Sequence, residues 1–237
     1  MIRGLLRRRL PYLTPLAVLA LRLQDADRLA AELSPEDYFQ LVNDSWGALD
    51  PLVRPYHAAQ ARHWDAGMIY YFFPQPDRDH HFNAIAFAIA ARGAIARVSR
   101  TWQARRPWLR PLALEQGITD GREWFGAFQT AASFEFVALG DSTARAMRLA
   151  ACAQGGMVLA SKSVLSAMPP ALQAQVRFGI RRGDRAAGEV MVPGAYAALA
   201  SLNRAAELPS PLPEDAGLAV TEIFDLADEA AAPLPPR

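Results

Sequence analysis

Apolar residues near the start of the chain form first a continuous run and then a helical pattern. The segment 13–23 is short and apolar, with prolines near its start at positions 11 and 15, and this pattern favours a buried strand. The segment Ser34-Pro35-Glu36-Asp37 offers an N-cap serine, a proline at the first helical position and acidic residues after it. Apolar residues then recur at spacings of three and four up to Val53, so a helix with one apolar face is predicted.

Further along, the pattern predicts a hairpin, a long helix and then several short strands. Residues 57–64 and 68–73 flank the turn Asp65-Ala66-Gly67 and read as a hairpin. Asp77 or Asp79 can cap a helix that runs to about residue 105. The remaining expected elements are a helix at 141–153 and strands at 112–119, 123–128, 134–139, 157–160, 176–181 and 189–192.

This order of elements predicts an α+β fold of the ferredoxin-like kind, with a mostly antiparallel sheet and helices packed on one face. A basic N-terminal arm is expected at residues 1–12 and the folded domain at 13–199. Residues 200–237 form a Pro/Ala-rich tail, in which residues 218–226 could make a short contact motif.

Composition and charge narrow the range of partners. Lysine and arginine number 25 against 24 acidic residues, so a net charge of +1 calls for no nucleic acid or membrane surface. The longest apolar stretches fall well short of the roughly 18–20 residues of a membrane span, so no transmembrane segment is expected. Cys152 is the only cysteine, which rules out an intrachain disulfide and favours a cytoplasmic location.

An ordered set of short motifs carries a family resemblance. Gly117-Ile118-Thr119-Asp120-Gly121 is followed by the segment 136–149, which contains Gly140-Asp141 and Arg148, and then by Gly155-Gly156. Together with the predicted first strand, helix start and hairpin, these motifs resemble the catalytic domain of class III nucleotidyl cyclases. The resemblance covers roughly residues 13–182 and implies the cyclase fold.

The resemblance also implies a defined chemistry, the conversion of a nucleoside triphosphate to a cyclic monophosphate. In the family, two aspartates hold two divalent ions, which lower the pKa of the attacking hydroxyl and stabilise phosphate charge. An asparagine orients the ribose, an arginine neutralises the transferring phosphate, and a lysine with a polar partner reads the base. Both members of a head-to-tail dimer supply these groups.

The two metal positions carry over poorly to this chain. Asp25, at the end of the first predicted strand, is the candidate for the first metal aspartate, although the loss of the second metal position favours a role as a cap of the following helix. A gapless register from the helix start would place Arg22 there instead, which would abolish the site. The second metal position falls on Ala66, so Asp65 could serve only if the turn reoriented its side chain.

The remaining catalytic positions are also changed. The base-reading lysine becomes Arg62 and its polar partner becomes Val137, which has no hydrogen-bonding group. The ribose asparagine becomes Ala144, whereas Arg148 keeps the family's transition-state arginine. Each lost polar group costs about 10²–10³-fold in rate, so the combination predicts little remaining catalysis.

Three functional hypotheses follow. The first is a catalytically inactive cyclase-like domain that acts in signalling as a homodimer or as a heterodimer with another signalling protein, with no cofactor. The second is a weak, metal-dependent nucleotidyl cyclase, a phosphorus-oxygen lyase, in which Asp25 and Asp65 hold Mg²⁺ or Mn²⁺. The third is a module that senses nucleotides through Arg62 and Arg148 without turnover.

One further pair of residues needs an interpretation. His80 and His81 stand at the start of the long helix, and no cysteine or third ligand is evident beside them in the sequence. The sequence therefore favours a place on the helix surface for both histidines over a zinc site.

Overall fold

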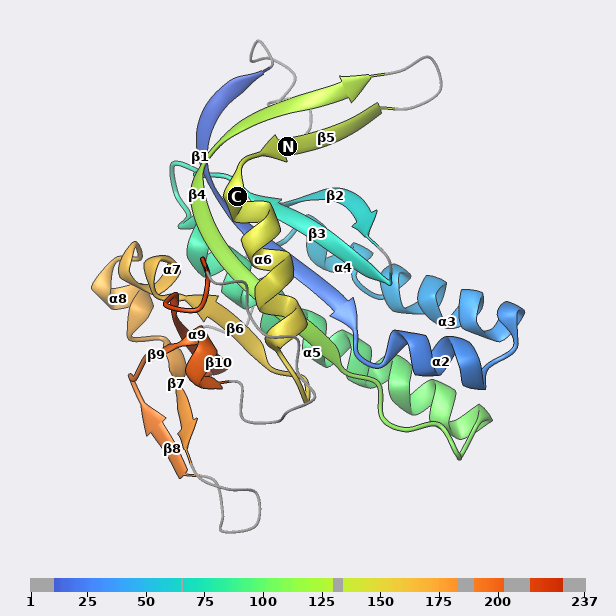
Figure 1. Cartoon of the computed structure of the whole chain (residues 1–237). Coiled ribbons are helices and arrows are strands. Elements are labelled where there is room, and N and C mark those ends of the chain that lie inside the picture. Colours follow the sequence, from blue (N-terminus) through green and yellow to red (C-terminus); the bar gives the residue numbers. More distant parts are fainter. Residues whose placement is uncertain (1–10, 65, 130–133, 183–189, 203–213, 228–237) are drawn as a thin grey trace.

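The chain folds around one twisted sheet (Figure 1). The computed structural model describes residues 11–64, 66–129, 134–182, 190–202 and 214–227. The strands lie in the order β2-β3-β1-β4-β6-β10-β7-β8, with β5 paired to β4 and β9 paired to β10. Every pair is antiparallel except β4 with β6. The strands are β1 (Tyr12–Leu23), β2 (Ala58–Trp64), β3 (Gly67–Phe72), β4 (Leu114–Gln129), β5 (Phe134–Leu139), β6 (Val158–Ser161), β7 (Val176–Arg182), β8 (Val190–Pro193), β9 (Ala197–Ala198) and β10 (Ala219–Leu226).

Helices pack on the face of the sheet that buries the larger core. Alternate residues of β1, including Leu19 and Leu21, join Leu29, Leu41 and Phe87 of the covering helices in one apolar cluster. The predicted α+β fold, with a mostly antiparallel sheet and helices on one face, is therefore confirmed. The helices are α2 (Ala26–Glu32), α3 (Pro35–Gly47), α4 (Asp50–Val53), α5 (His80–Arg105), α6 (Asp141–Cys152), α7 (Lys162–Ser166), α8 (Pro170–Gln173) and α9 (Leu199–Leu202).

Helix α6 lies on the opposite face of the sheet, in front of β1 and β4 in Figure 1. Ala146 and Ala150 of α6 pack there against Val18 and Ala20 of β1. Gly117 of β4 makes this close approach possible, because an added Cβ would lie 2.5 Å from the backbone nitrogen of Ala150 and clash. The α6 face is therefore where the family-like motifs of β4 and α6 meet.

Local signals in the sequence agree with the start of the fold. Ser34 is the N-cap of α3, and its side chain accepts a hydrogen bond from the backbone N–H of Asp37 at 3.1 Å. Asp79, one of the two expected caps of the long helix, accepts from the N–H of Phe82 at 2.9 Å. Short-range capping patterns therefore located both helix starts.

Two expectations about strands were wrong. The segment at Asp120-Gly121 is not a turn between two strands, because β4 runs through it and pairs there with Ala17 and Leu16 of β1. The domain also does not end at residue 199, because β10 lies inside the sheet between β6 and β7. Residues 218–226 are therefore part of the domain core and not a contact motif in a tail. The expected arm at residues 1–12 lies almost wholly outside the described residues.

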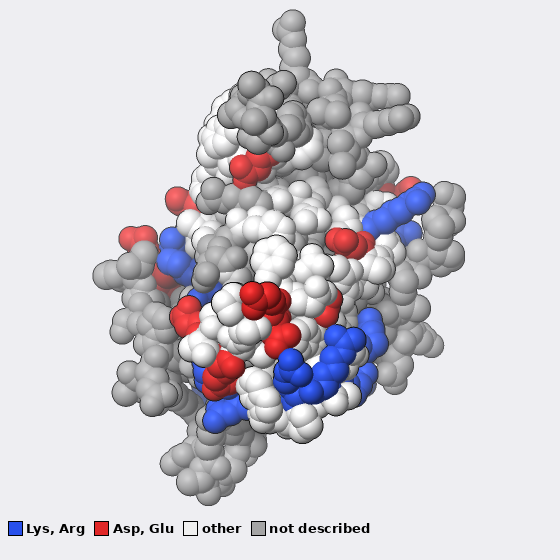
Figure 2. Space-filling model, turned by 90° about the vertical axis from the view of Figure 1, so that its right-hand side faces the viewer, with Lys and Arg blue, Asp and Glu red and all other residues white. Residues whose placement is uncertain are grey.

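Two surface properties complete the description of the fold. By length and composition alone, α5 could cross a membrane, but 56% of its most apolar window is buried inside the protein, as in a core helix. On the face shown in Figure 2, acidic side chains gather beside basic ones among uncharged residues. This face carries both signs of charge, in line with the net charge of +1.

Candidate functional site

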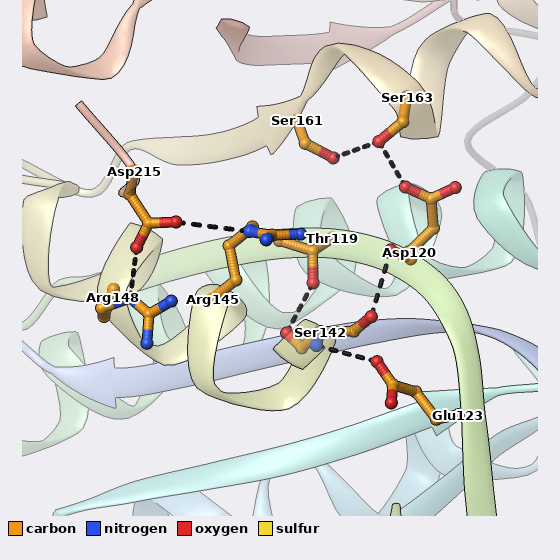
Figure 3. Close-up of polar contacts among 9 residues, drawn as sticks. All are labelled: Thr119, Asp120, Glu123, Ser142, Arg145, Arg148, Ser161, Ser163 and Asp215. Carbon is orange, nitrogen blue, oxygen red and sulfur yellow. Dashed lines mark hydrogen bonds and ion pairs between the residues drawn. The ribbon is translucent and has the colours of Figure 1, made fainter. Parts of the chain in front are cut away.

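The N-terminus of α6 is held by side chains from β4 (Figure 3). Oε1 of Glu123 accepts a hydrogen bond from the backbone N–H of Ser142 at 2.8 Å, and so caps the helix in place of Gly140. Oγ of Thr119 donates to the carbonyl oxygen of Ser142 at 2.8 Å. Gly140 has φ 154°, and the Glu123 carboxylate occupies the place where a Cβ at this residue would lie. These contacts fix the orientation of α6, which carries the family's arginine position.

Arg148 does not stand free on α6. Its Nε donates to Oδ2 of Asp215, and Nε of Arg145 donates to Oδ1 of the same carboxylate at 3.3 Å. Figure 3 shows Asp215 beside both arginines. It comes from the segment just before β10, and its side chain is only 2% exposed. A carboxylate from the C-terminal part of the chain therefore pairs with Arg148, the position that the resemblance assigns to the transition-state arginine.

An ion pair joins β1 to β4 near the end of β1, on the α6 face of the sheet. Arg22 lies opposite Glu115 in the β1–β4 register, and its Nε and Nη2 donate to Oε2 of Glu115 at 2.8 and 2.6 Å. Burial raises the pKa of Glu115, although hydrogen bonds and charge from Arg22 act in the opposite direction. Arg22 is also the partner of Gly67 on β3, directly beside the hairpin turn.

The two expected metal aspartates do not form a described site. Asp25 lies after the end of β1 at the N-cap position of α2, with a left-handed backbone (φ 55°) and no capping hydrogen bond to its side chain. Its carboxylate is 48% exposed and contacts Arg28 at 3.4 Å. Asp65 lies outside the described residues. Ala66 is buried, and its carbonyl accepts from the N–H of Leu23 at 3.1 Å.

The expected base and ribose positions fall on three different elements. The backbone of Arg62 lies in β2, where the register with β3 shifts between Gln60 and His63, and its side chain is outside the described part. Ala144 is exposed on α6, one turn before Arg148. Val137 of β5 lines a shallow apolar groove with Trp124, Gly126, Phe128, Leu139, Pro11 and Ala127. The Val137 position is therefore surrounded by apolar side chains and glycine.

A polar cluster that sequence reasoning missed lies at the N-terminus of α5. His81 is 7% exposed and lies between two carboxylates, with Nδ1 3.5 Å from Asp79 and Nε2 3.6 Å from Asp120. Oγ of Ser163 donates to the other oxygen of Asp120. Burial lowers the pKa of His81, but the two carboxylates outweigh it and raise the pKa to about 9. The surface placement expected for His81 is therefore wrong.

Comparisons with known proteins give the fold a family context. The chain matches no protein-family model and no curated protein. Its structure is similar to that of the adenylyl cyclase CyaB from P. aeruginosa, with a TM-score of 0.67, 17% identity and coverage of 92% of this chain and 97% of the other. The guanylyl cyclase Cya2 is also similar, with a TM-score of 0.69 and 15% identity, and the match covers 92% of this chain and 95% of the other.

A third similar structure is the non-canonical dimeric guanylyl cyclase domain of the RhoGC fusion protein from the aquatic fungus Blastocladiella emersonii. Here the TM-score is 0.60 at 11% identity, and the match covers 90% of this chain and 97% of the other. All three matches span nearly the whole of both chains at low identity. Strand order, helix placement and these similarities agree with the sequence resemblance, and this chain has the fold of class III cyclase catalytic domains.

Proposed function

We propose that this domain is a catalytically inactive relative of class III nucleotidyl cyclases that acts in signalling by dimerisation or by contact with another signalling protein. The observation that carries the proposal is the position of Arg22. In the family, both metal aspartates hold the same pair of ions, so the first must lie beside the hairpin turn that bears the second. Here the β1 residue beside that turn, opposite Gly67, is Arg22.

The chemistry at this position opposes a metal site. Mg²⁺ and Mn²⁺ take oxygen ligands, mostly carboxylates, and a guanidinium offers only N–H donors and a positive charge. The neighbouring carboxylate, Glu115, already accepts two hydrogen bonds from Arg22. Asp25 lies two residues past the end of β1 and contacts Arg28. The described residues therefore do not fit the two-ion site that the fold family implies, and no catalytic step is derived through it.

The phosphate-binding position gives independent support. In the family, the arginine on this helix neutralises charge on the transferring phosphate, so it must be available to the substrate. Arg148 instead donates to Asp215, whose carboxylate is buried. A triphosphate would have to compete with this carboxylate for Arg148.

An exposed apolar stripe on β1, β4 and β5 supports a role in association. Leu13, Trp124 and Leu139 lie opposite one another across the three strands, and each side chain is about half exposed. Phe128 extends the stripe along β4 and is 56% exposed. A contiguous apolar surface of this kind is typical of a protein interface. The similar fungal cyclase domain is dimeric, so a second cyclase-like domain is the partner we propose.

One alternative rests on a specific observation. Two guanidinium groups, from Arg145 and Arg148, converge on the single carboxylate of Asp215, which leaves one positive charge in excess. A nucleotide-sensing module could use this charge to hold phosphates without turnover.

The main proposal also includes a cytoplasmic location, which is expected from the single cysteine.

The decisive experiment combines a product assay with a mass measurement. Purified full-length protein is incubated with each of the four ribonucleoside triphosphates and Mg²⁺ or Mn²⁺, and products are resolved by mass spectrometry. We expect no cyclic nucleotide above the level of a D25A/D65A double variant. In light scattering, we expect the mass of a dimer, either for the protein alone or for its mixture with an active cyclase domain. Cyclic product that the double variant lacks would establish the weak cyclase instead.

A further inference from the structure

The polar cluster at the start of α5 has the composition of a transition-metal site. Asp79, His80 and His81 each place one possible ligand atom so that the three atoms lie within 4.8 Å of one another. Two imidazoles and one carboxylate are a common protein ligand set for zinc, with the fourth position open to water. Neither the proposed role in association nor the cyclase resemblance uses this cluster.

The spacing of the atoms fits a metal ion. Nδ1 of His81 lies 3.5 Å from Oδ1 of Asp79. Two ligands of a tetrahedral ion with bonds of about 2.0–2.1 Å lie about 3.3–3.4 Å apart, so this pair is already close to the separation required. The rings of His80 and His81 lie side by side, with their centroids 3.9 Å apart. The possible ligand atom of His80 lies within 4.8 Å of the other two, so a change in its side-chain torsions could bring it to the same centre.

One buried nitrogen of the cluster makes an ion-pair contact but no hydrogen bond. His81 is more than nine-tenths buried, and its Nδ1 has no hydrogen-bond partner among the described residues, although it is directed toward Asp79. Buried side-chain polar atoms are normally satisfied by protein, water or an ion. A cation bound between Asp79 and His81 would satisfy this nitrogen.

The outer contacts match those of known metal-binding histidines. Nε2 of His81, on the far side of the ring, faces Oδ2 of Asp120 at 3.6 Å. Asp120 in turn accepts a hydrogen bond from Ser163. A carboxylate behind a ligating histidine fixes the tautomer and the orientation of the ring. The two carboxylates also supply two negative charges to balance one divalent cation at the positive end of α5.

We propose that Asp79, His80 and His81 bind a divalent transition-metal ion of the Zn²⁺ class, with Asp120 as the positioning residue behind His81. The site joins α5 to β4 and, through Ser163, to α7, so bound metal would stabilise the domain. It is separate from the position of the family's catalytic ions. Asp120 and Glu115 lie five residues apart on β4, or about 17 Å of strand, and Glu115 belongs to the α6 face.

The test is a Zn²⁺ titration of untagged, chelator-treated full-length protein by calorimetry near neutral pH, repeated with Co²⁺ to read coordination geometry from visible absorption. We expect one equivalent of Zn²⁺ to bind and to raise the melting temperature. H80A is the primary variant because His80 is only half buried, and D79N keeps an oxygen to cap α5. Each should weaken Zn²⁺ binding by at least about tenfold, and D120N should weaken it by about 10–100-fold.

Controls separate this site from others in the chain. The chain has four histidines, so H57A/H63A removes the other two and should bind Zn²⁺ as the wild type does. D25A/D65A should also bind normally, which separates this proposal from the proposed function. The proposal is overturned if the wild type binds no Zn²⁺, or if H80A and D79N, folded by circular dichroism, bind it with unchanged affinity.

Discussion

Arg22 and Glu115 face each other across β1 and β4, and two N–H groups of the arginine donate to one carboxylate oxygen at 2.6 and 2.8 Å. Glu115 is 6% exposed, whereas the side chain of Arg22 keeps 31% of its surface in contact with water. The pair lies beside the hairpin turn, where the family resemblance requires a metal-binding carboxylate. An ion pair therefore occupies the β1 position beside the turn, where a gapless register would place the first metal ligand.

Removal of Arg22 should destabilise the domain. In R22A, the carboxylate of Glu115 stays buried without its partner, and we expect a loss of about 2–3 kcal/mol in the free energy of unfolding, measured in urea. E115Q together with R22A should recover part of this loss, because the uncompensated charge is then gone. R28A, which breaks only exposed contacts with Asp25 and Glu32, is the control and should cost less than about 0.5 kcal/mol. Equal losses in R22A and R28A would contradict a structural role for the pair.

The contact between α6 and β4 depends on Gly117. An alanine there would place its Cβ against the backbone of Ala146 and Ala150, which cannot move without shifting the helix. We expect G117A to lower the free energy of unfolding by at least about 1–3 kcal/mol. Gly93 is a matched control in α5, where an added Cβ meets only the end of Arg97 at 3.9 Å. G93A should be neutral or stabilise the protein by up to about 1 kcal/mol, since alanine favours helix.

Local patterns in the sequence predicted much of the fold. Ser34 and Asp79 cap their helices through residues three positions away, so a short window contains the whole signal. By contrast, Asp120-Gly121 has the composition of a turn, yet it continues as a strand because β1 pairs with both residues. Tertiary pairing outweighed local preference there.

Long-range contacts explain what the sequence could not predict about the site. Asp215 reaches Arg148 across 67 residues of chain, and no local pattern marks that contact. β10 was assigned to a tail because a proline-rich stretch precedes it, although its partners β6 and β7 bury it in the sheet. For His81, the second carboxylate comes from Asp120 on β4, so only the packing of α5 on the sheet reveals the cluster.

Release of Arg148 should increase affinity for phosphates. D215N removes the negative charge between Arg145 and Arg148 but keeps the size of the side chain, so both guanidinium groups become available. We expect D215N to bind ATP or GTP about tenfold more tightly than the wild type in calorimetry at low salt. The double variant R148A/D215N should lose this gain. Unchanged binding by D215N would show that Asp215 does not block the phosphate position.

The apolar stripe on β1, β4 and β5 should control association. W124E places a charge at the centre of the stripe, between Leu13 and Leu139. Because Trp124 is exposed, we expect the variant to fold normally. We expect W124E to raise the dimer dissociation constant at least about tenfold in sedimentation experiments, because a buried unpaired charge opposes an apolar interface. F39E is the control, since Phe39 is 76% exposed on α3, away from the stripe. Dimers that persist in W124E but dissociate in F39E would place the interface on α3 instead.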